Sequence, residues 1–239
     1  MAYLNRMFIG IFDVLKVFID KFVADPGNQW GFTIILFTLL FNLLMLPINI
    51  KQMKSMQKTQ ALQPELDELK KKYKNDPKKM QEMQMKLYEE NNISMFGGCL
   101  PLLITYPLFI AMFGVFRQLV ADGTLTGMRF TPIIPDLAAR GNIILSILSV
   151  LTMLGSTYVT TLKNKQIAGD NKAAGSANTM QYVMSLFFGY ITYTTNAALG
   201  LYWVTGNLFR MIQGLALNAV ESKKLEKEDL GNKNIKKKK

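Results

Sequence analysis

Polar side chains recur at helical spacing inside segments of this chain that carry no charge. Within residues 141–162 they repeat every three or four positions and so share one helix face: Asn142, Ser146, Ser149, Thr152 and Ser156. Thr38 and Asn42 form a similar pair four residues apart. Amide and hydroxyl groups exchange hydrogen bonds and hold water, but they do not titrate near neutral pH. The spacing therefore predicts helix faces that bind and solvate rather than transfer protons.

The residue inventory excludes most other chemistry. The 239 residues include no His and one Cys, which excludes a disulfide framework and the usual structural zinc sites. A chain without His cannot form the Ser/His or HExxH arrangements of intramembrane proteases, and it contains no GxxxxGKS/T loop for nucleotides. The uncharged segments also lack the Asp, Glu or His of a proton relay. We therefore expect no enzymatic activity, no metal and no cofactor.

Four stretches contain no Asp, Glu, Lys or Arg and are long enough to cross a membrane as helices: 31–50, 97–116, 141–162 and 178–209. As one helix, residues 178–217 would be about 60 Å long, twice the thickness of a hydrocarbon core. Asn196 and Gly200 are therefore expected to break this segment into two spans. The predicted fold class is an all-α membrane protein with five transmembrane helices.

The segments between the spans set the organisation and the orientation. We predict an interfacial helix with its linker at 1–29, spans at 30–50, 97–116, 141–162, 178–196 and 197–217, a cytoplasmic helical hairpin at 51–96, an external loop at 117–140, a cytoplasmic loop at 163–177 and a basic tail at 218–239. Of the 28 Lys and Arg residues, 22 lie in the hairpin, the 163–177 loop and the part from Arg210 onward. Basic loops stay in the cytoplasm, so the N-terminus is expected outside and the C-terminus inside.

The apolar segment 7–23 carries Asp13, Lys16 and Asp20 on one side of a helix. This pattern favours a helix lying in the membrane interface. The alternative is a signal peptide, whose apolar centre is normally uninterrupted. The sequence Asp-Pro-Gly-Asn at 25–28 is expected to end this helix before the first span.

Two apolar stripes predict the hairpin, one formed by Leu62, Leu66, Leu69 and Tyr73 and the other by Met80, Met83 and Leu87. Pro64 suits the first turn of one helix, and Asp76 and Pro77 suit the cap and first residue of the next. The methionines of this region fit two interpretations, hairpin core or an adaptable surface for substrates and partners: Met53, Met56, Met80, Met83 and Met85.

Four stretches resemble the YidC-type membrane protein insertase family: WGFTIILFTLLFNLLMLP at 30–47, LQPELDELKKKY at 62–73, GGCLPLLITYP at 97–107 and LGLYWVTGNLFRMIQ at 199–213. Together with the matching order of spans, the resemblance covers nearly the whole chain. It implies five helices that enclose a polar groove open to the cytoplasm and the lipid and closed outside. It also implies a multi-pass monomer of the bacterial plasma membrane that helps newly made membrane proteins insert, alone or beside the Sec translocon.

The resemblance assigns roles to individual positions. Many members carry an Arg in the first span, five residues before the proline that ends its apolar run, and Pro47 places that position at Asn42. Asn can hold water in a groove, but it supplies no charge to attract acidic substrate tails. Thr38 matches a groove-facing position one turn earlier. Tyr202 and Trp203 match the aromatic pair that touches passing substrates in the last span.

Each of these positions also has a structural interpretation. Helix packing explains the stripe within 141–162 as well as groove lining does. The alternative for Asn42 is a buried interhelical hydrogen bond, and for Tyr202 and Trp203 it is an interfacial aromatic belt. Near the cytoplasmic end of its span, Arg210 suits the role of a snorkelling anchor.

The basic tail has two candidate partners. Its last residues, Lys236, Lys237, Lys238 and Lys239, suit anionic lipid headgroups or, as the resemblance implies, the RNA of a ribosome. Two alternative functions stay open at this point. A small-solute transporter or channel could use the same polar stripes, and a non-translocating assembly factor would need no groove at all.

Overall fold

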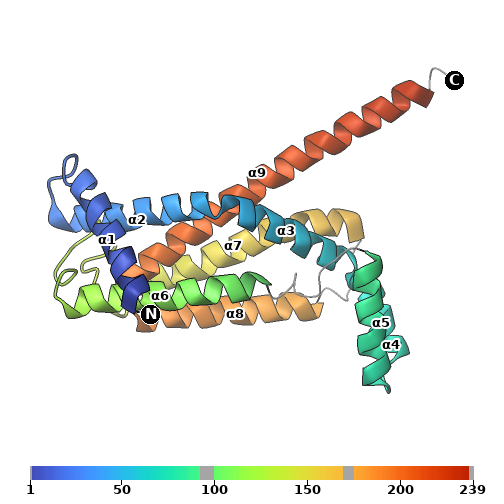
Figure 1. Cartoon of the computed structure of the whole chain (residues 1–239), viewed down its shortest axis with the longest axis horizontal. Coiled ribbons are helices and arrows are strands. Elements are labelled where there is room, and N and C mark those ends of the chain that lie inside the picture. The colour runs from blue at the N-terminus through green and yellow to red at the C-terminus, as the bar shows by residue number, and fades with distance from the viewer. Residues whose placement is uncertain (1, 92–99, 169–174, 237–239) are drawn as a thin grey trace.

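The computed structural model describes residues 2–91, 100–168 and 175–236 (Figure 1). Within these ranges the chain forms nine helices and no β-strand: α1 (Ala2–Ile19), α2 (Pro26–Leu44), α3 (Leu46–Ala61), α4 (Gln63–Lys72), α5 (Pro77–Glu90), α6 (Leu100–Ala121), α7 (Ile143–Ala168), α8 (Gly175–Thr194) and α9 (Ala197–Lys236). Phe130 and Ile134 form an isolated bridge between α6 and α7. The predicted all-α class is confirmed for this part of the chain.

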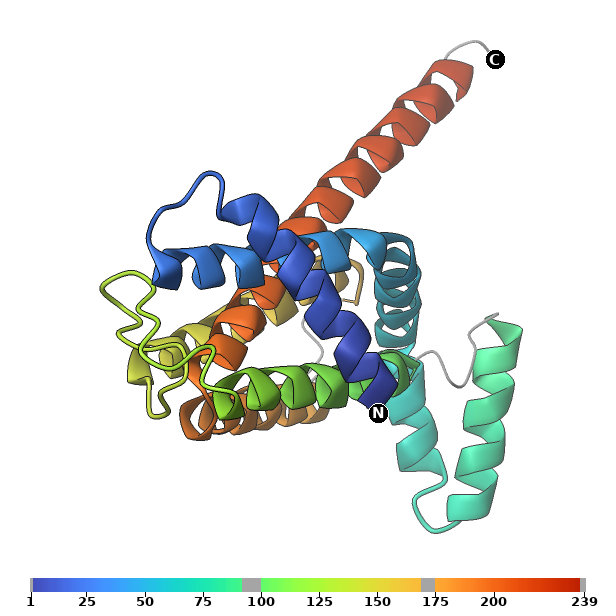
Figure 2. The same cartoon turned by 60° about the vertical axis from the view of Figure 1, so that its left-hand side comes forward.

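The helices α2, α6, α7, α8 and α9 lie side by side as a bundle (Figures 1 and 2). α7 packs against α8 and α9, and α2 packs against α9. α1 crosses the bundle at one end, where it contacts α2 and α6, and the α4–α5 pair extends beyond the other end. We call these the α1 end and the hairpin end of the bundle.

Aromatic side chains hold α1 against the bundle. Phe12 is fully buried, with its ring centroid 4.3 Å from that of Phe37 in α2 and 5.7 Å from that of Phe116 in α6. Lys16 Nζ pairs with Asp20 Oδ2 at 2.8 Å, one turn along the helix. α1 runs from Ala2 to Ile19, so it begins before the apolar segment 7–23 and ends within it.

Helix breaks follow local capping signals. Asp25 caps α2 by accepting a hydrogen bond from the Asn28 amide at 2.8 Å, and Pro26 is the first helical residue. The predicted span 30–50 is divided at Met45 between α2 and α3, close to Pro47, which has no amide hydrogen to continue an unbroken helix. Asn196 caps α9 through the Leu199 amide at 3.0 Å.

Gly200 is not the helix break that its position suggested. It lies inside α9, where a Cβ atom would be 2.9 Å from Thr192 Cγ2 of α8. The glycine therefore permits close approach of the two helices rather than a turn. α6 and α9 also continue beyond the predicted spans 97–116 and 197–217, to Ala121 and Lys236.

The helical hairpin consists of α4 and α5, which pack against each other in the antiparallel arrangement predicted (Figure 2). Asp76 caps α5 by accepting from the Lys79 amide at 3.1 Å, and Pro77 is its first residue. Leu62 and Leu66 are buried. α3 lies outside this pair and packs against α7, so residues 51–90 form a connecting helix followed by a hairpin shorter than predicted.

Candidate functional site

The buried interior changes character along the bundle. Toward the α1 end, a continuous apolar cluster joins α1, α2, α6, α7 and α9. Its buried members nearest to the hairpin end are Phe37 on α2, Leu145 on α7 and Val204 on α9. Toward the hairpin end, the buried positions of the same helices are mostly polar or glycine: Thr38, Asn42, Ser149, Thr152, Gly206, Asn207, Gln213 and Gly214. We call this second set the polar half of the interior.

Thr38 and Asn42 lie against the backbone of α9. A Cβ atom on Gly206 would be 3.7 Å from Thr38 Cγ2 and 3.8 Å from Asn42 Nδ2. Their hydrogen bonds stay within α2, because Thr38 Oγ1 donates to the Ile34 carbonyl at 2.6 Å and Asn42 Nδ2 to the Thr38 carbonyl at 2.8 Å. The interhelical hydrogen bond considered for Asn42 is therefore not formed among the described residues.

Two buried amides of α9 have unsatisfied groups. Asn207 Nδ2, Gln213 Nε2 and Gln213 Oε1 have no hydrogen-bond partner among the described residues. An unsatisfied buried polar group costs about 1–3 kcal/mol, so each of these amides requires a polar partner. Gln213 was missed from the sequence because it lies beyond the uncharged run that ends at residue 209. Its seven-residue spacing from Gly206, which places both on one helix face, is the signal that points to it.

The stripe on α7 divides between two environments. Ser146 Oγ donates to the Gly189 carbonyl of α8 at 2.6 Å, and Thr192 Oγ1 of α8 donates to Ser149 Oγ at 3.2 Å. These two serines therefore join α7 to α8, which fits the packing interpretation. Thr152 Oγ1 instead bonds the Leu148 carbonyl of its own helix at 2.7 Å, and Ser156 Oγ bonds the Met153 carbonyl at 2.9 Å.

Asn142 does not join the rest of the stripe. Its side chain caps α7 by accepting from the Leu145 amide at 3.0 Å and donates to the Ile133 carbonyl at 3.0 Å. Because α7 begins at Ile143, Asn142 lies at the α1 end, away from Asn42 and Thr152. Asn142 has the spacing of the stripe, but its side chain caps the N-terminus of α7.

Tyr202 and Trp203 form part of an aromatic cluster between α6, α8 and α9. The Trp203 ring centroid lies 4.6 Å from that of Phe188 and 5.1 Å from that of Phe109. The Tyr202 ring lies 6.0 Å from Phe116. Both residues are half-buried and pack against the apolar cluster.

The other predicted contact residues lie apart from one another. Met53 of α3 touches the bundle, since its Cε would be 3.4 Å from a Cβ atom on Gly214. Met80 and Met83 are half-buried in α5, Met85 is 39% exposed, and the side chain of Met56 lies outside the described residues. Lys236 ends α9, and Lys237, Lys238 and Lys239 also lie outside the described residues.

The segment 122–142 covers the α1 end of the bundle. The Ala197 and Ala198 amides donate to the carbonyls of Ala139 and Leu137 at 2.8 and 2.9 Å. At the start of α2, Gly31 makes room for the ring of Phe130, which a Cβ atom would overlap. The 122–142 segment therefore packs against α2 and α9 at the end where the interior is apolar.

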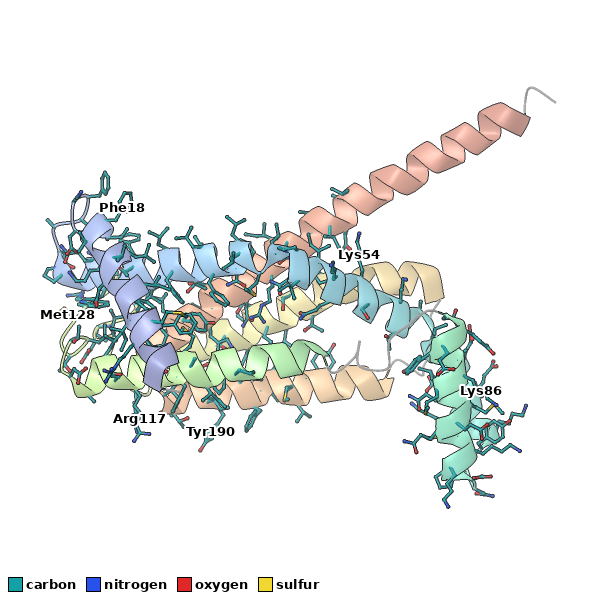
Figure 3. The ribbon with its side chains drawn as sticks, viewed as in Figure 1. Phe18, Lys54, Lys86, Arg117, Met128 and Tyr190 are labelled. Carbon is teal, nitrogen blue, oxygen red and sulfur yellow. The ribbon has the colours of Figure 1, made fainter. Side chains whose placement is uncertain are left out.

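The outer surfaces of the helices are apolar. Leu44 of α2, Leu151 of α7 and Leu186 of α8 are 68, 57 and 65% exposed. Tyr190 projects from the bundle in Figure 3. Among the described residues, α2 is the helix that is both long and apolar enough to cross a membrane, and shorter apolar helical stretches occupy 109–121 and 143–159.

Comparison with known proteins gives consistent matches. Residues 21–224 match the family described as 60Kd inner membrane protein. The chain is 39% identical to the membrane protein insertase YidC of Clostridium tetani, over 98% of this chain and 99% of that protein. It is also 39% identical to the YidC of Clostridium perfringens, over 98 and 97%.

A solved structure is similar as well. It is the crystal structure of an active YidC insertase with its first transmembrane domain resolved, with a TM-score of 0.63 and 29% sequence identity. The match covers 87% of this chain and 45% of that one. The chain thus spans nearly the full length of the clostridial relatives and about half of the crystallised one.

Proposed function

The chain belongs to the 60Kd inner membrane protein family, which contains the YidC insertases, and from this premise we propose how it inserts other membrane proteins. The polar half of the interior is a wet groove that receives the polar segment of a newly made membrane protein. Five spans, formed by α2 with the start of α3, α6, α7, α8 and the first part of α9, surround it. The α1 end faces outward and the hairpin end faces the cytoplasm, alone or beside the Sec translocon.

One observation carries this proposal. The amides of Asn207 and Gln213 are buried without partners in the part of the bundle where Thr38 and Asn42 approach α9. Because buried amides require hydrogen bonds, water or a polar substrate segment satisfies them. The apolar cluster and the 122–142 segment close the opposite end, so the recess opens toward the hairpin end.

The mechanism is relief of the desolvation cost. A charged residue at the centre of a membrane costs about 2.5–3.5 kcal/mol on insertion scales. A recess that keeps such a residue hydrated partway across shortens the dry path. The apolar helix of the substrate leaves between spans into lipid, driven by its own burial. Thr152, Ser156, Tyr202 and Trp203 line this path in the proposal, and no nucleotide is consumed.

Two contacts outside the groove belong to the same proposal. α1 lies in the outer interface with its charged side in water, and the α4–α5 hairpin and the tail from 218 onward lie in the cytoplasm. There the methionines of α5 contact substrates or partners, and the basic tail contacts lipid or the ribosome.

The test is insertion of a short-tailed single-span protein into liposomes that contain the purified chain, scored by protease protection. Empty liposomes give the background. We expect insertion above background, a decrease for Asn42→Leu and retention for Asn42→Thr, which remains polar. Insertion at background level would reject autonomous insertase activity, and equal insertion by Asn42→Leu would reject the groove.

Solvent access separates the insertase from an assembly factor without a groove. A single cysteine at position 42, in a Cys99→Ser background, is expected to react with a membrane-impermeant thiol reagent added from the cytoplasmic side. The same substitution at Phe37, inside the apolar cluster, is the matched control and is expected to be protected. Protection at both positions would favour the assembly factor.

A further inference from the structure

Arg210 occupies the centre of the inward face of α9. Residues three and four positions away on either side share its helix face, and all four are buried: Gly206, Asn207, Gln213 and Gly214. Arg210 itself is exposed. An exposed residue surrounded by buried residues of its own helix face borders an opening within the bundle.

The outward side of α9 is the opposite one. Leu208, Ile212 and Leu215 are 39, 63 and 49% exposed, and they lie two or five positions from Arg210, on the far side of the helix. A snorkelling anchor extends along a lipid-facing surface. Since Arg210 starts from the inward side, this placement does not support the anchor suggested by its position in the sequence.

The contacts of the neighbouring glycines locate the opening. Gly206 lies against Thr38 and Asn42 of α2, whereas a Cβ on Gly214 would be 3.0 Å from Val159 Cγ1 of α7 and 3.4 Å from Met53 Cε of α3. Arg210 is one turn from each glycine, so it lies on the side of α9 that faces α2, α3 and α7. By seven-residue spacing, Asn207 lies on the side of Gly214 and Gln213 on the side of Gly206. Arg210 therefore lies between the two unsatisfied amides.

Arg210 has no acidic partner among the residues that the structure describes. The helices α2, α3 and α7 contain no Asp or Glu, and none of the ion pairs formed by the described residues involves Arg210. A guanidinium remains charged at every physiological pH. Thirteen residues separate it from Ala197, about 20 Å of helix in a hydrocarbon core of about 30 Å. An ionisable residue at this depth marks a functional position.

We propose that Arg210 determines substrate specificity by binding carboxylate side chains in the polar segment of the protein being inserted. This inference rests on the proposed function and deepens it. A planar guanidinium binds a carboxylate through two parallel hydrogen bonds. The nearby amides of Asn207 and Gln213 supply further donors, so an Asp or Glu of the substrate finds several partners at one place in the recess.

The test compares substrates that differ only in tail charge. The full-length chain is reconstituted in phosphatidylcholine vesicles and supplied with a single-span protein whose short tail carries three Asp, three Asn or three Lys residues. We expect Arg210→Gln to lower insertion of the Asp tail by about threefold to tenfold and to leave the Asn tail unchanged. Arg210→Lys should retain the preference, and Arg210→Glu should transfer it to the Lys tail. Arg117→Gln is the matched control, because Arg117 is exposed on α6 and points away from the bundle (Figure 3).

The outcomes separate the inference from the function on which it depends. If the unaltered chain inserts no tail, the proposed function fails. If it inserts every tail and Arg210→Gln lowers all of them equally, Arg210 is structural and the inference is wrong. A preference that appears only when anionic lipid is added would assign the guanidinium to lipid headgroups and would also overturn it.

A second measurement does not depend on the stability of Arg210→Gln. In Arg210→Lys, a zero-length carbodiimide joins the new amine to a carboxylate in contact with it. We expect a crosslink to the Asp tail during insertion and none to the Asn tail. Absence of the Asp-tail crosslink, while Arg210→Lys still inserts that substrate, would contradict direct contact.

Discussion

Gly206 of α9 lies directly against Asn42 of α2, so that a Cβ atom on the glycine would be 3.8 Å from Asn42 Nδ2. The two helices meet here without a side chain from α9 between them. The amide of Asn42 thus borders the interior beside the backbone of α9, within the polar half.

This contact predicts a graded response at position 206. Gly206→Ala adds a methyl group at ordinary van der Waals distance and should preserve insertion, with a helix stabilised by about 0.5–1 kcal/mol. Gly206→Leu should obstruct the recess and lower insertion in the liposome assay. Ala216→Leu, at an exposed position of the same helix, is the control. Full activity of Gly206→Leu would show that the path does not pass between α2 and α9.

The hydrogen bond between Thr192 and Ser149 predicts a structural effect that is separate from activity. Removing it with Ser149→Ala and Thr192→Val should reveal a coupling free energy of about 0.6 kcal/mol in a double-mutant cycle of unfolding. Insertion should remain near the unaltered level, because Ser149, although it belongs to the polar half of the interior, engages its hydroxyl in the contact between α7 and α8. Loss of insertion with unchanged stability would instead place Ser149 in the substrate path.

The start of α2 predicts a stability effect at Gly31. A Cβ atom there would overlap the Phe130 ring, so Gly31→Ala should displace the 122–142 segment and destabilise the protein by about 1–3 kcal/mol. Thermal unfolding in detergent would measure this loss. Gly10→Ala is the matched control, because no atom lies within 4 Å of a Cβ at Gly10. Equal stability of the two variants would show that the loop does not need this close approach.

The hairpin predicts a pH dependence. The hydrogen bond from Lys86 lowers the pKa of Glu82 below its ordinary 4.5 and raises the pKa of Lys86 above its ordinary 10.5. The stabilisation of α5 by Glu82 is complete above the pKa that Glu82 has in the unfolded chain. It disappears as the pH falls through the lowered pKa of the folded state. The stabilisation of α5 by Lys86 is complete below the pKa that Lys86 has in the unfolded chain. It disappears as the pH rises through the raised pKa of the folded state.

Hydrogen exchange of the α5 amides should therefore show a small stabilisation between these limits that Glu82→Gln removes. Because both side chains are exposed, the effect should also shrink in high salt. A pH profile of α5 that is identical in Glu82→Gln would mean that the pair does not stabilise this helix.

Local signals predicted much of the fold. The cap at Asp76, the proline at the start of α5, the apolar stripe through Leu62 and Leu66 and the break at Asn196 all appear where the sequence placed them. Each depends on residues within a few positions of one another, so the chain carries the full information locally. Gly200 failed as a helix break because its role depends on contact with Thr192, a residue of another helix.

The candidate site also combines features that the sequence predicts with features that depend on contacts between helices. The sequence alone determined that uncharged segments carry polar helix faces, that the basic residues gather in particular loops and that no Asp, Glu or His lies within these segments. Only the tertiary structure decided which polar group meets which neighbour: Ser149 bonds α8, Asn142 caps its own helix, and Arg210 faces inward between Asn207 and Gln213. The physical reason is that periodicity places residues on a common side of a helix, whereas the packing of the other helices decides whether that side meets a partner, lipid or water.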